Sequence, residues 1–145
     1  MAVQRSIAAA LLLAGLPLLA RASPPGPDHP IVGTWTLTLG NTPCMETYEF
    51  RADGTSRVTS GFEQVTTEYD VSNRLTADGY YELLDTITSS NGKRDCTGNV
   101  TPVGDRSKIF LRPQRSGMLM CVDATLSNCV GLLVKQVGAG SSRRK

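Results

Sequence analysis

The chain has 145 residues, of which 40% are hydrophobic and 19% charged, and its formal net charge is +2. This length predicts a single domain. The near balance of 15 Lys and Arg against 13 Asp and Glu argues against the basic surface that nucleic-acid binding requires.

Residues 1–22 have the pattern of a cleavable signal peptide. Arg5 precedes the apolar run 7–20, and Ala20-Arg21-Ala22 supplies the small–x–small pattern of a cleavage site. The run is shorter than the ~20 residues that a membrane-spanning helix needs, so no stable membrane anchor is expected. The sequence predicts a secreted or periplasmic protein that is cleaved near Ala22-Ser23. Without Arg5 and Arg21, 13 Lys and Arg face 13 Asp and Glu, a net charge of zero.

The remaining chain divides into a leader, one domain and a tail. Residues 23–30 hold four prolines and predict an extended, mobile leader in which His29 is solvated. Residues 138–145 have the composition of a flexible basic tail. The folded domain is therefore expected over 31–137.

Within 31–137, apolar residues recur with the period of two that is typical of half-buried strands. No segment shows an apolar stripe at helical spacing, and turn signals such as Asp53-Gly54 and Asn91-Gly92 separate the strands. Strands are expected over 31–39, 46–50, 55–60, 62–72, 80–89, 108–112, 117–122 and 129–137, and 96–103 is either a short strand or irregular. The prediction is an all-β fold, an antiparallel up-and-down barrel of about eight strands that hides its sheet edges. A two-sheet β-sandwich is the alternative.

The first strand carries Gly33-Thr34-Trp35 after Ile31-Val32, and Tyr48-Glu49-Phe50 and Ala52-Asp53-Gly54-Thr55 follow. This pattern resembles the start of small secreted lipocalin-like barrels. The resemblance implies that Trp35 plugs the closed end and that Gly33 lets the chain turn beneath it. It also implies an Arg packed over the Trp, for which Arg112 and Arg115 are candidates.

The four cysteines, Cys44, Cys96, Cys121 and Cys129, form an even set in an exported chain, which predicts two disulfides. In an up-and-down barrel all four fall near one end, which by the resemblance is the mouth. Cys44–Cys96 with Cys121–Cys129 is the favoured pairing, and pairing between the two loops is the alternative. Because no CxxC pair is present, no metal site is predicted.

No catalytic residues and no cofactor are predicted. His29 is the only histidine, so a Ser–His or Cys–His nucleophile pair has no base. The strand carboxylates are expected mostly on the solvated faces of their strands. These are Glu46, Glu49, Glu63, Glu68, Asp70, Glu82 and Asp85.

Two functions fit this reading. The first is binding of a small apolar molecule at the barrel mouth by inward-facing residues, namely Leu37, Leu39, Phe50, Val65, Tyr69, Tyr81, Leu83, Phe110, Met118 and Met120. The second is an extracytoplasmic inhibitor or interaction protein that presents rigid loops to a protein partner such as a lysozyme or protease. Ser60-Gly61 resembles the start of a Ser–Gly–x–x–Tyr loop of periplasmic lysozyme inhibitors, but the Tyr is absent.

Overall fold

The computed structural model of this chain describes residues 24–40 and 42–137. The expected signal peptide (1–22), its cleavage point and the expected tail (138–145) lie outside the described residues. Within the described ranges, no helix is long and apolar enough to cross a bilayer.

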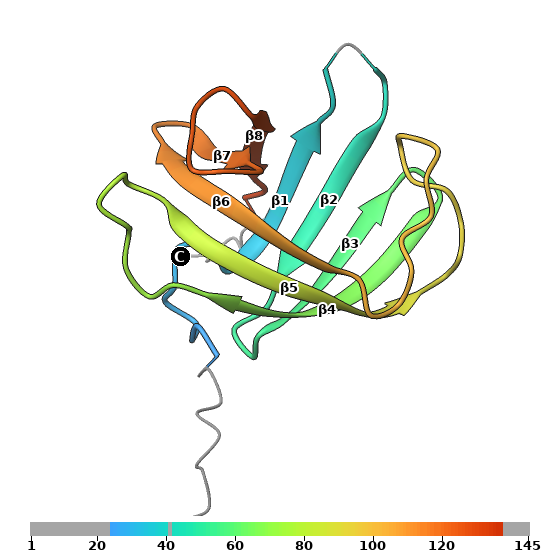
Figure 1. Cartoon of the computed structure of the whole chain (residues 1–145), viewed down its shortest axis with the longest axis horizontal. Coiled ribbons are helices and arrows are strands. Elements are labelled where there is room, and N and C mark those ends of the chain that lie inside the picture. The colour runs from blue at the N-terminus through green and yellow to red at the C-terminus, as the bar shows by residue number, and fades with distance from the viewer. Residues whose placement is uncertain (1–23, 41, 138–145) are drawn as a thin grey trace, which may run out of the picture.

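Eight antiparallel strands close into one up-and-down barrel (Figure 1). Each strand pairs with the next, and the last returns to the first through the pairs Trp35–Lys135 and Leu37–Leu133. The barrel prediction is confirmed, and the sandwich alternative is wrong. The strands are β1 (Gly33–Thr38), β2 (Met45–Phe50), β3 (Thr55–Ser60), β4 (Glu63–Val71), β5 (Tyr81–Ser90), β6 (Arg106–Gln114), β7 (Gly117–Cys121) and β8 (Cys129–Lys135).

The ambiguous segment 96–103 lies in the connection between β5 and β6 and forms no strand. A row of hydrogen bonds to side chains replaces strand pairing there. One Asp95 carboxylate oxygen accepts the backbone N–H groups of Thr97 and Asn99. The side chains of 96–103 do not alternate regularly between covered and exposed positions, as those of a strand would.

The interior is filled by alternate residues of all the strands, as the pleat requires. A buried cluster fills the interior from the end where the chain enters. Its members are Ile31, Trp35, Leu37, Phe50, Tyr69, Leu83, Leu111, Met118, Met120 and Leu133.

Trp35 sits at this end of the barrel and is 4% exposed. Its indole Nε1 donates to the carbonyl of Ile31 at 2.7 Å. Gly33 has φ +133°, and a Cβ at Gly33 would lie 2.7 Å from Lys135 Cε. Glycine is therefore required by the backbone, and a side chain at this position would also displace the end of the Lys135 side chain.

The cation over the Trp35 ring is Lys135, with its Nζ 5.1 Å from the ring centroid. Arg112 instead lies over Tyr80, 5.7 Å from that ring. Arg112, one of the two candidates, does not pack over Trp35, because it comes from β6, which does not border β1, whereas Lys135 comes from β8, which does.

The leader does not behave as a free segment from Pro24 onward. The amide of Gly26 donates to the carbonyl of Ala52, and His29 is only 8% exposed. His29 Nδ1 accepts the N–H of Ile31 at 3.3 Å, and Nε2 lies 3.2 Å from the carbonyl of Ser72. The expectation of a solvated His29 is wrong, because the leader packs across the closed end.

Candidate binding site at the mouth of the barrel

The lumen has two zones that differ in exposure. Around Trp35 and Leu133 the side chains are almost fully buried and fill the barrel. Toward the opposite end, which we call the mouth, some inward-facing side chains are half-buried, among them Leu39, Tyr48 and Ile109, whereas others, such as Val65 and Met120, are buried. A ligand therefore meets a packed floor and a partly open wall.

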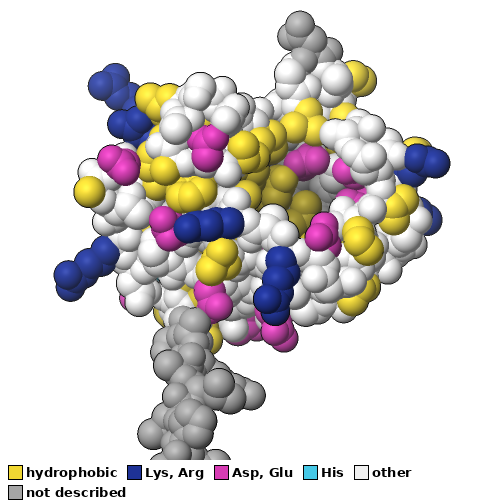
Figure 2. All heavy atoms as spheres, in the orientation of Figure 1, with side chains coloured by type: hydrophobic (Ala, Val, Ile, Leu, Met, Phe, Trp, Pro, Cys, Tyr) yellow, Lys and Arg dark blue, Asp and Glu magenta, His cyan; other side chains and the backbone are white. Residues whose placement is uncertain are grey.

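The space-filling view shows this opening directly (Figure 2). The surface is hollowed, hydrophobic side chains form the floor of the hollow, and Asp and Glu side chains border it. Lys and Arg side chains on this face lie outside the hollow, one of them just below its border. The mouth is thus apolar at depth and acidic at its border.

The structure places most of the predicted ligand-binding residues in the packed floor. Leu37, Phe50, Val65, Tyr69, Leu83, Met118 and Met120 are at most 5% exposed. Leu39 and Tyr81 are half-buried against this core. Of these nine, Leu39 combines partial exposure with a place at the mouth, because it follows β1 whereas Tyr81 begins β5 at the closed end.

Phe110 is not an interior residue, so its prediction is wrong. Its neighbours Ile109 and Leu111 pack into the core, and successive strand residues point to opposite faces. The Phe110 ring meets Tyr80 edge-on, and Lys108 Nζ lies 5.0 Å from its centroid. Phe110 thus belongs to the outer face of β6.

A chain of hydrogen bonds crosses the wall between β2 and β3. Tyr48 donates its hydroxyl proton to Glu46 Oε2 at 2.5 Å, and Ser60 Oγ donates to Glu46 Oε1 at 2.6 Å. Burial raises the pKa of Tyr48, and the charges of Glu46 and Asp85 raise it further. Tyr48 therefore stays neutral and serves as a hydrogen-bond donor.

Asp85 faces the lumen from β5, where it pairs in register with Ser107 of β6. Its Oδ1 accepts the Ser107 hydroxyl at 2.5 Å. Burial raises the pKa of Asp85, and this outweighs the hydrogen bonds from Ser107 that lower it. Because Asp85 also raises the pKa of Tyr48, its charge acts across the lumen on β2.

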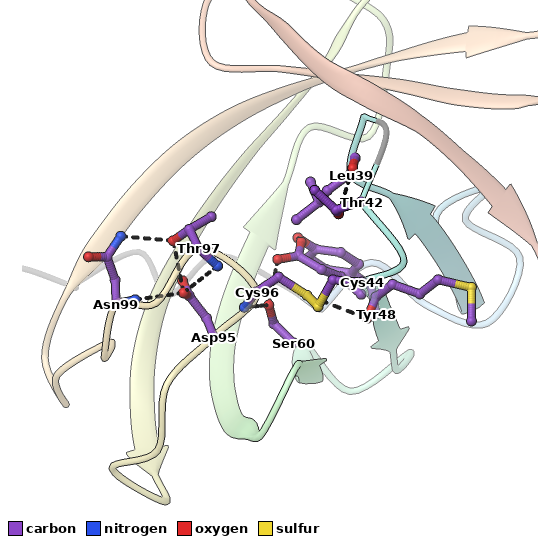
Figure 3. The surroundings of a disulfide bond; sticks show 11 residues. Leu39, Thr42, Cys44, Tyr48, Ser60, Asp95, Cys96, Thr97 and Asn99 are labelled. Carbon is purple, nitrogen blue, oxygen red and sulfur yellow. Dashed lines mark hydrogen bonds between the residues drawn. A yellow bond between two sulfur atoms is a disulfide. The ribbon is translucent and has the colours of Figure 1, made fainter.

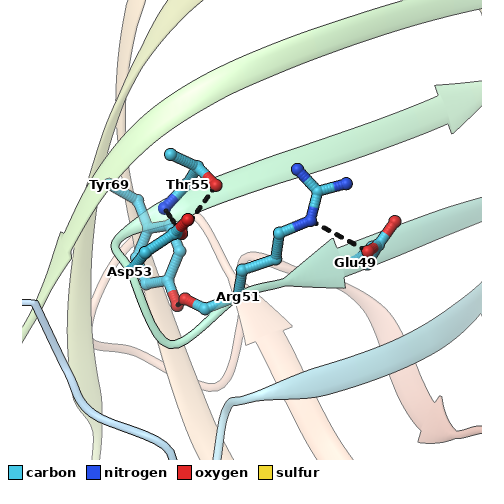
Figure 4. A network of polar contacts seen from close by, with 5 residues as sticks. All are labelled: Glu49, Arg51, Asp53, Thr55 and Tyr69. Atoms are coloured by element: carbon cyan, nitrogen blue, oxygen red, sulfur yellow. Dashed lines mark hydrogen bonds and ion pairs between the residues drawn. The ribbon is translucent and has the colours of Figure 1, made fainter.

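These interior carboxylates have no cationic partner among residues 24–40 and 42–137. The two ion pairs there are Arg51–Glu49 at 2.9 Å and Lys108–Glu82 at 3.1 Å, both on the outer face. Figure 4 shows the Arg51–Glu49 pair beside the β2–β3 turn. The outer carboxylates Glu49 and Glu82 are thus neutralised locally, whereas Glu46 and Asp85 are not.

Sequence reasoning missed Glu46 and Asp85, although the signal was present. Glu46 has the same parity as Tyr48 and Phe50, and Asp85 has the same parity as Leu83 and Ile87. Glu63, which also points inward, is 4% exposed and accepts the N–H of Thr101 at 2.6 Å, so it fastens the β5–β6 connection.

The rim of the mouth is stapled. Cys44 is bonded to Cys96 and Cys121 to Cys129, as the favoured pairing predicted. Figure 3 shows the Cys44–Cys96 bridge next to Tyr48 and Ser60. The Cys96 amide donates to Ser60 Oγ at 3.0 Å, so the stapled loop is tied to the hydroxyl that holds Glu46. The carboxylate is therefore held in place before any ligand arrives.

A second depression, with a volume of about 950 Å³, lies on the outer face of β3 to β6. Pro24 borders it at one end, and Glu68 and Arg106 are among its lining residues. It is an open groove floored by the sheet, and Tyr69, Leu84 and Asp85 also line it. We regard the mouth as the better binding site, because it is hollowed into the barrel above a packed apolar floor and is bordered by two disulfides.

No family model, curated protein or solved structure matches this chain.

Proposed function

We propose that this protein binds a small molecule with an apolar body in the mouth of its barrel, outside the cytoplasm. The observation that carries the proposal is the half-buried lumen wall around Leu39, Tyr48 and Ile109 above a fully packed floor. Apolar surface that stays in contact with water is unfavourable. A ligand that covers it gains binding free energy of roughly 25 cal/mol per Å².

Two features support this function. The Cys44–Cys96 and Cys121–Cys129 bridges fix the rim, and a preorganised rim lowers the entropy lost on binding. The same two disulfides fit an oxidising compartment, in keeping with the proposed export signal.

The test is binding of N-phenyl-1-naphthylamine, a neutral apolar dye that fluoresces when it leaves water. Ile109→Trp fills the lumen wall and should weaken dye binding at least tenfold. Lys108→Trp places the same bulk on the outer face of the same strand and should leave binding unchanged. No fluorescence increase with the unaltered protein, or equal binding by both variants, would refute the proposal. Native mass spectrometry of the protein purified from its host then identifies the natural ligand.

A second candidate function, docking to a protein, is favoured by Phe62. Its side chain is 80% exposed in the turn between β3 and β4. Its amide donates to the carbonyl of Arg94 at 3.2 Å, and its carbonyl accepts from Asn91 Nδ2 at 2.9 Å. An exposed aromatic side chain on a fixed turn is a typical interface anchor.

A pull-down from the exporting host tests this candidate. Phe62→Ser should abolish capture of a partner, and Leu75→Ser, which removes an exposed apolar side chain from the β4–β5 connection, should not. Recovery of no protein by the unaltered chain would eliminate it.

A further inference from the structure

We infer that the ligand of the mouth is a cationic amphiphile, that is, a protonated amine carried on an apolar body. This inference rests on the proposed function, because it assigns the charge of a molecule held in the same hollow. It comes from the combination of an apolar, partly open wall with the inward carboxylates of Glu46 and Asp85.

The ionisable groups of the lumen are almost all acidic. From β2 come Glu46 and Tyr48, from β4 Glu63 and Tyr69, and from β5 Tyr81 and Asp85, with Asp105 near Asp85. Among the described strand residues, the one cation whose side chain lies on the inward face is Lys135 of β8. It lies at the closed end, over Trp35, and not at the mouth. The field in the mouth is therefore negative among the described residues.

An unpaired carboxylate away from water is costly, because its hydration is lost without a compensating charge. The hydrogen bonds from Ser60 and Tyr48 to Glu46, and from Ser107 to Asp85, offset part of that cost. They supply no positive charge. An ammonium group would supply it, and it would replace water as the donor to the remaining carboxylate lone pairs.

The same arrangement disfavours an anionic ligand. A fatty-acid carboxylate in the hollow would face Glu46 and Asp85, and like charges at short range in a partly buried site repel strongly. A neutral alcohol would gain the apolar contacts alone. The expected order of affinity is therefore amine, then alcohol, then carboxylate.

Isothermal titration calorimetry at pH 7 with decylammonium, decanol and decanoate, each below its micelle concentration, tests this order. An alkylammonium group remains protonated at this pH. We expect decylammonium to bind at least tenfold more tightly than decanol, and decanoate to bind most weakly. Asp85→Asn and Glu46→Gln should each reduce the preference for the amine at least fivefold while leaving decanol affinity unchanged, which also verifies the fold.

Glu68→Gln is the matched control, because it removes a carboxylate from the outer groove and not from the lumen. If Glu46→Gln fails to fold, Asp85→Asn decides only together with Glu68→Gln, because Asp85 and Glu68 both line the outer groove. Equal binding of decylammonium and decanol overturns the inference and leaves the proposed function standing. Binding of none of the three ligands overturns the proposed function itself. Loss of the preference in Glu68→Gln, but not in the lumen variants, assigns the selection to the outer groove and also overturns the inference.

Discussion

The two disulfides are expected to contribute unequally to stability, because they close loops of very different length. Cys44 and Cys96 are 52 residues apart, whereas Cys121 and Cys129 are 8 apart. In the chain-entropy model these loops correspond to about 4 and about 2.5 kcal/mol of unfolding free energy at 25 °C. A small domain has roughly 5–15 kcal/mol in total, so loss of the longer bridge removes a large share.

The measurement is urea unfolding of two double variants, Cys44→Ala/Cys96→Ala and Cys121→Ala/Cys129→Ala. The first should lose about 1.5 kcal/mol more than the second, and its m-value should rise more because its denatured state expands further. Cys121 is fully buried, so its truncation adds a packing cost. Unfolding of the parent and both variants in dithiothreitol, which reduces the disulfides, measures this packing cost separately. After this correction, an equal or larger loss for the 121–129 variant would refute the loop-entropy reasoning.

Three further outcomes follow from the described contacts. His29→Ala removes the partners of two backbone groups and should cost about 1–3 kcal/mol while raising hydrogen exchange over 24–32, whereas Asp28→Asn should change neither. Burial, with a smaller effect of the Asp53 charge, raises the pKa of Tyr69 to about 12. Tyr69 contributes its full share of the folding stability below the unfolded pKa near 10, and this share is lost as pH rises toward 12. Tyr69→Phe should therefore flatten the loss of stability that urea unfolding measures over that pH range. Asp85→Asn should stabilise the protein at pH 7 but not at pH 3, also by urea unfolding.

The barrel was predictable because its residues repeat with one period along almost the whole chain. An alternation that places Trp35 and Leu37 inward also fixes which face of β1 meets the core, since a shift of one residue would invert every side chain. Phe110 shows the limit of this argument. Its strand has apolar residues at 109, 110 and 111 in succession, so the pattern does not show which alternate residues face inward. The large side chain of Phe110 favoured the wrong set.

The leader could not be predicted from its composition. Four prolines in eight residues describe what the backbone cannot form, and they say nothing about what it packs against. The hydrogen bond between His29 and Ser72 joins residues 43 positions apart, so it exists only once the barrel has brought the closed end together. Lys135 reaches Trp35 for the same reason, through closure of β8 onto β1.

The charge of the candidate site was readable in part. The rule that strand carboxylates face water holds for Glu49 and Glu82, which form ion pairs on the outer face. It fails for Glu46 and Asp85, whose parity with buried neighbours was the stronger signal. A general preference for exposure is worth less than the register of a particular strand, because the register is enforced by every hydrogen bond in the ladder.

Asp85 connects stability with the inferred ligand. Its pKa in the folded protein lies above the usual 3.8, chiefly because of burial, so ionisation favours the unfolded chain. Asp85 therefore costs no folding stability below its usual pKa of 3.8. Stability is lost as pH rises from there through the pKa of the folded protein. Asn at this position never ionises and retains an oxygen for Ser107, hence the expected gain at pH 7. Asp70→Asn, on the outer face, is the control. A variant less stable than the parent at pH 7 would show that Asp85 is structurally satisfied and would remove the reason for a cation in the mouth.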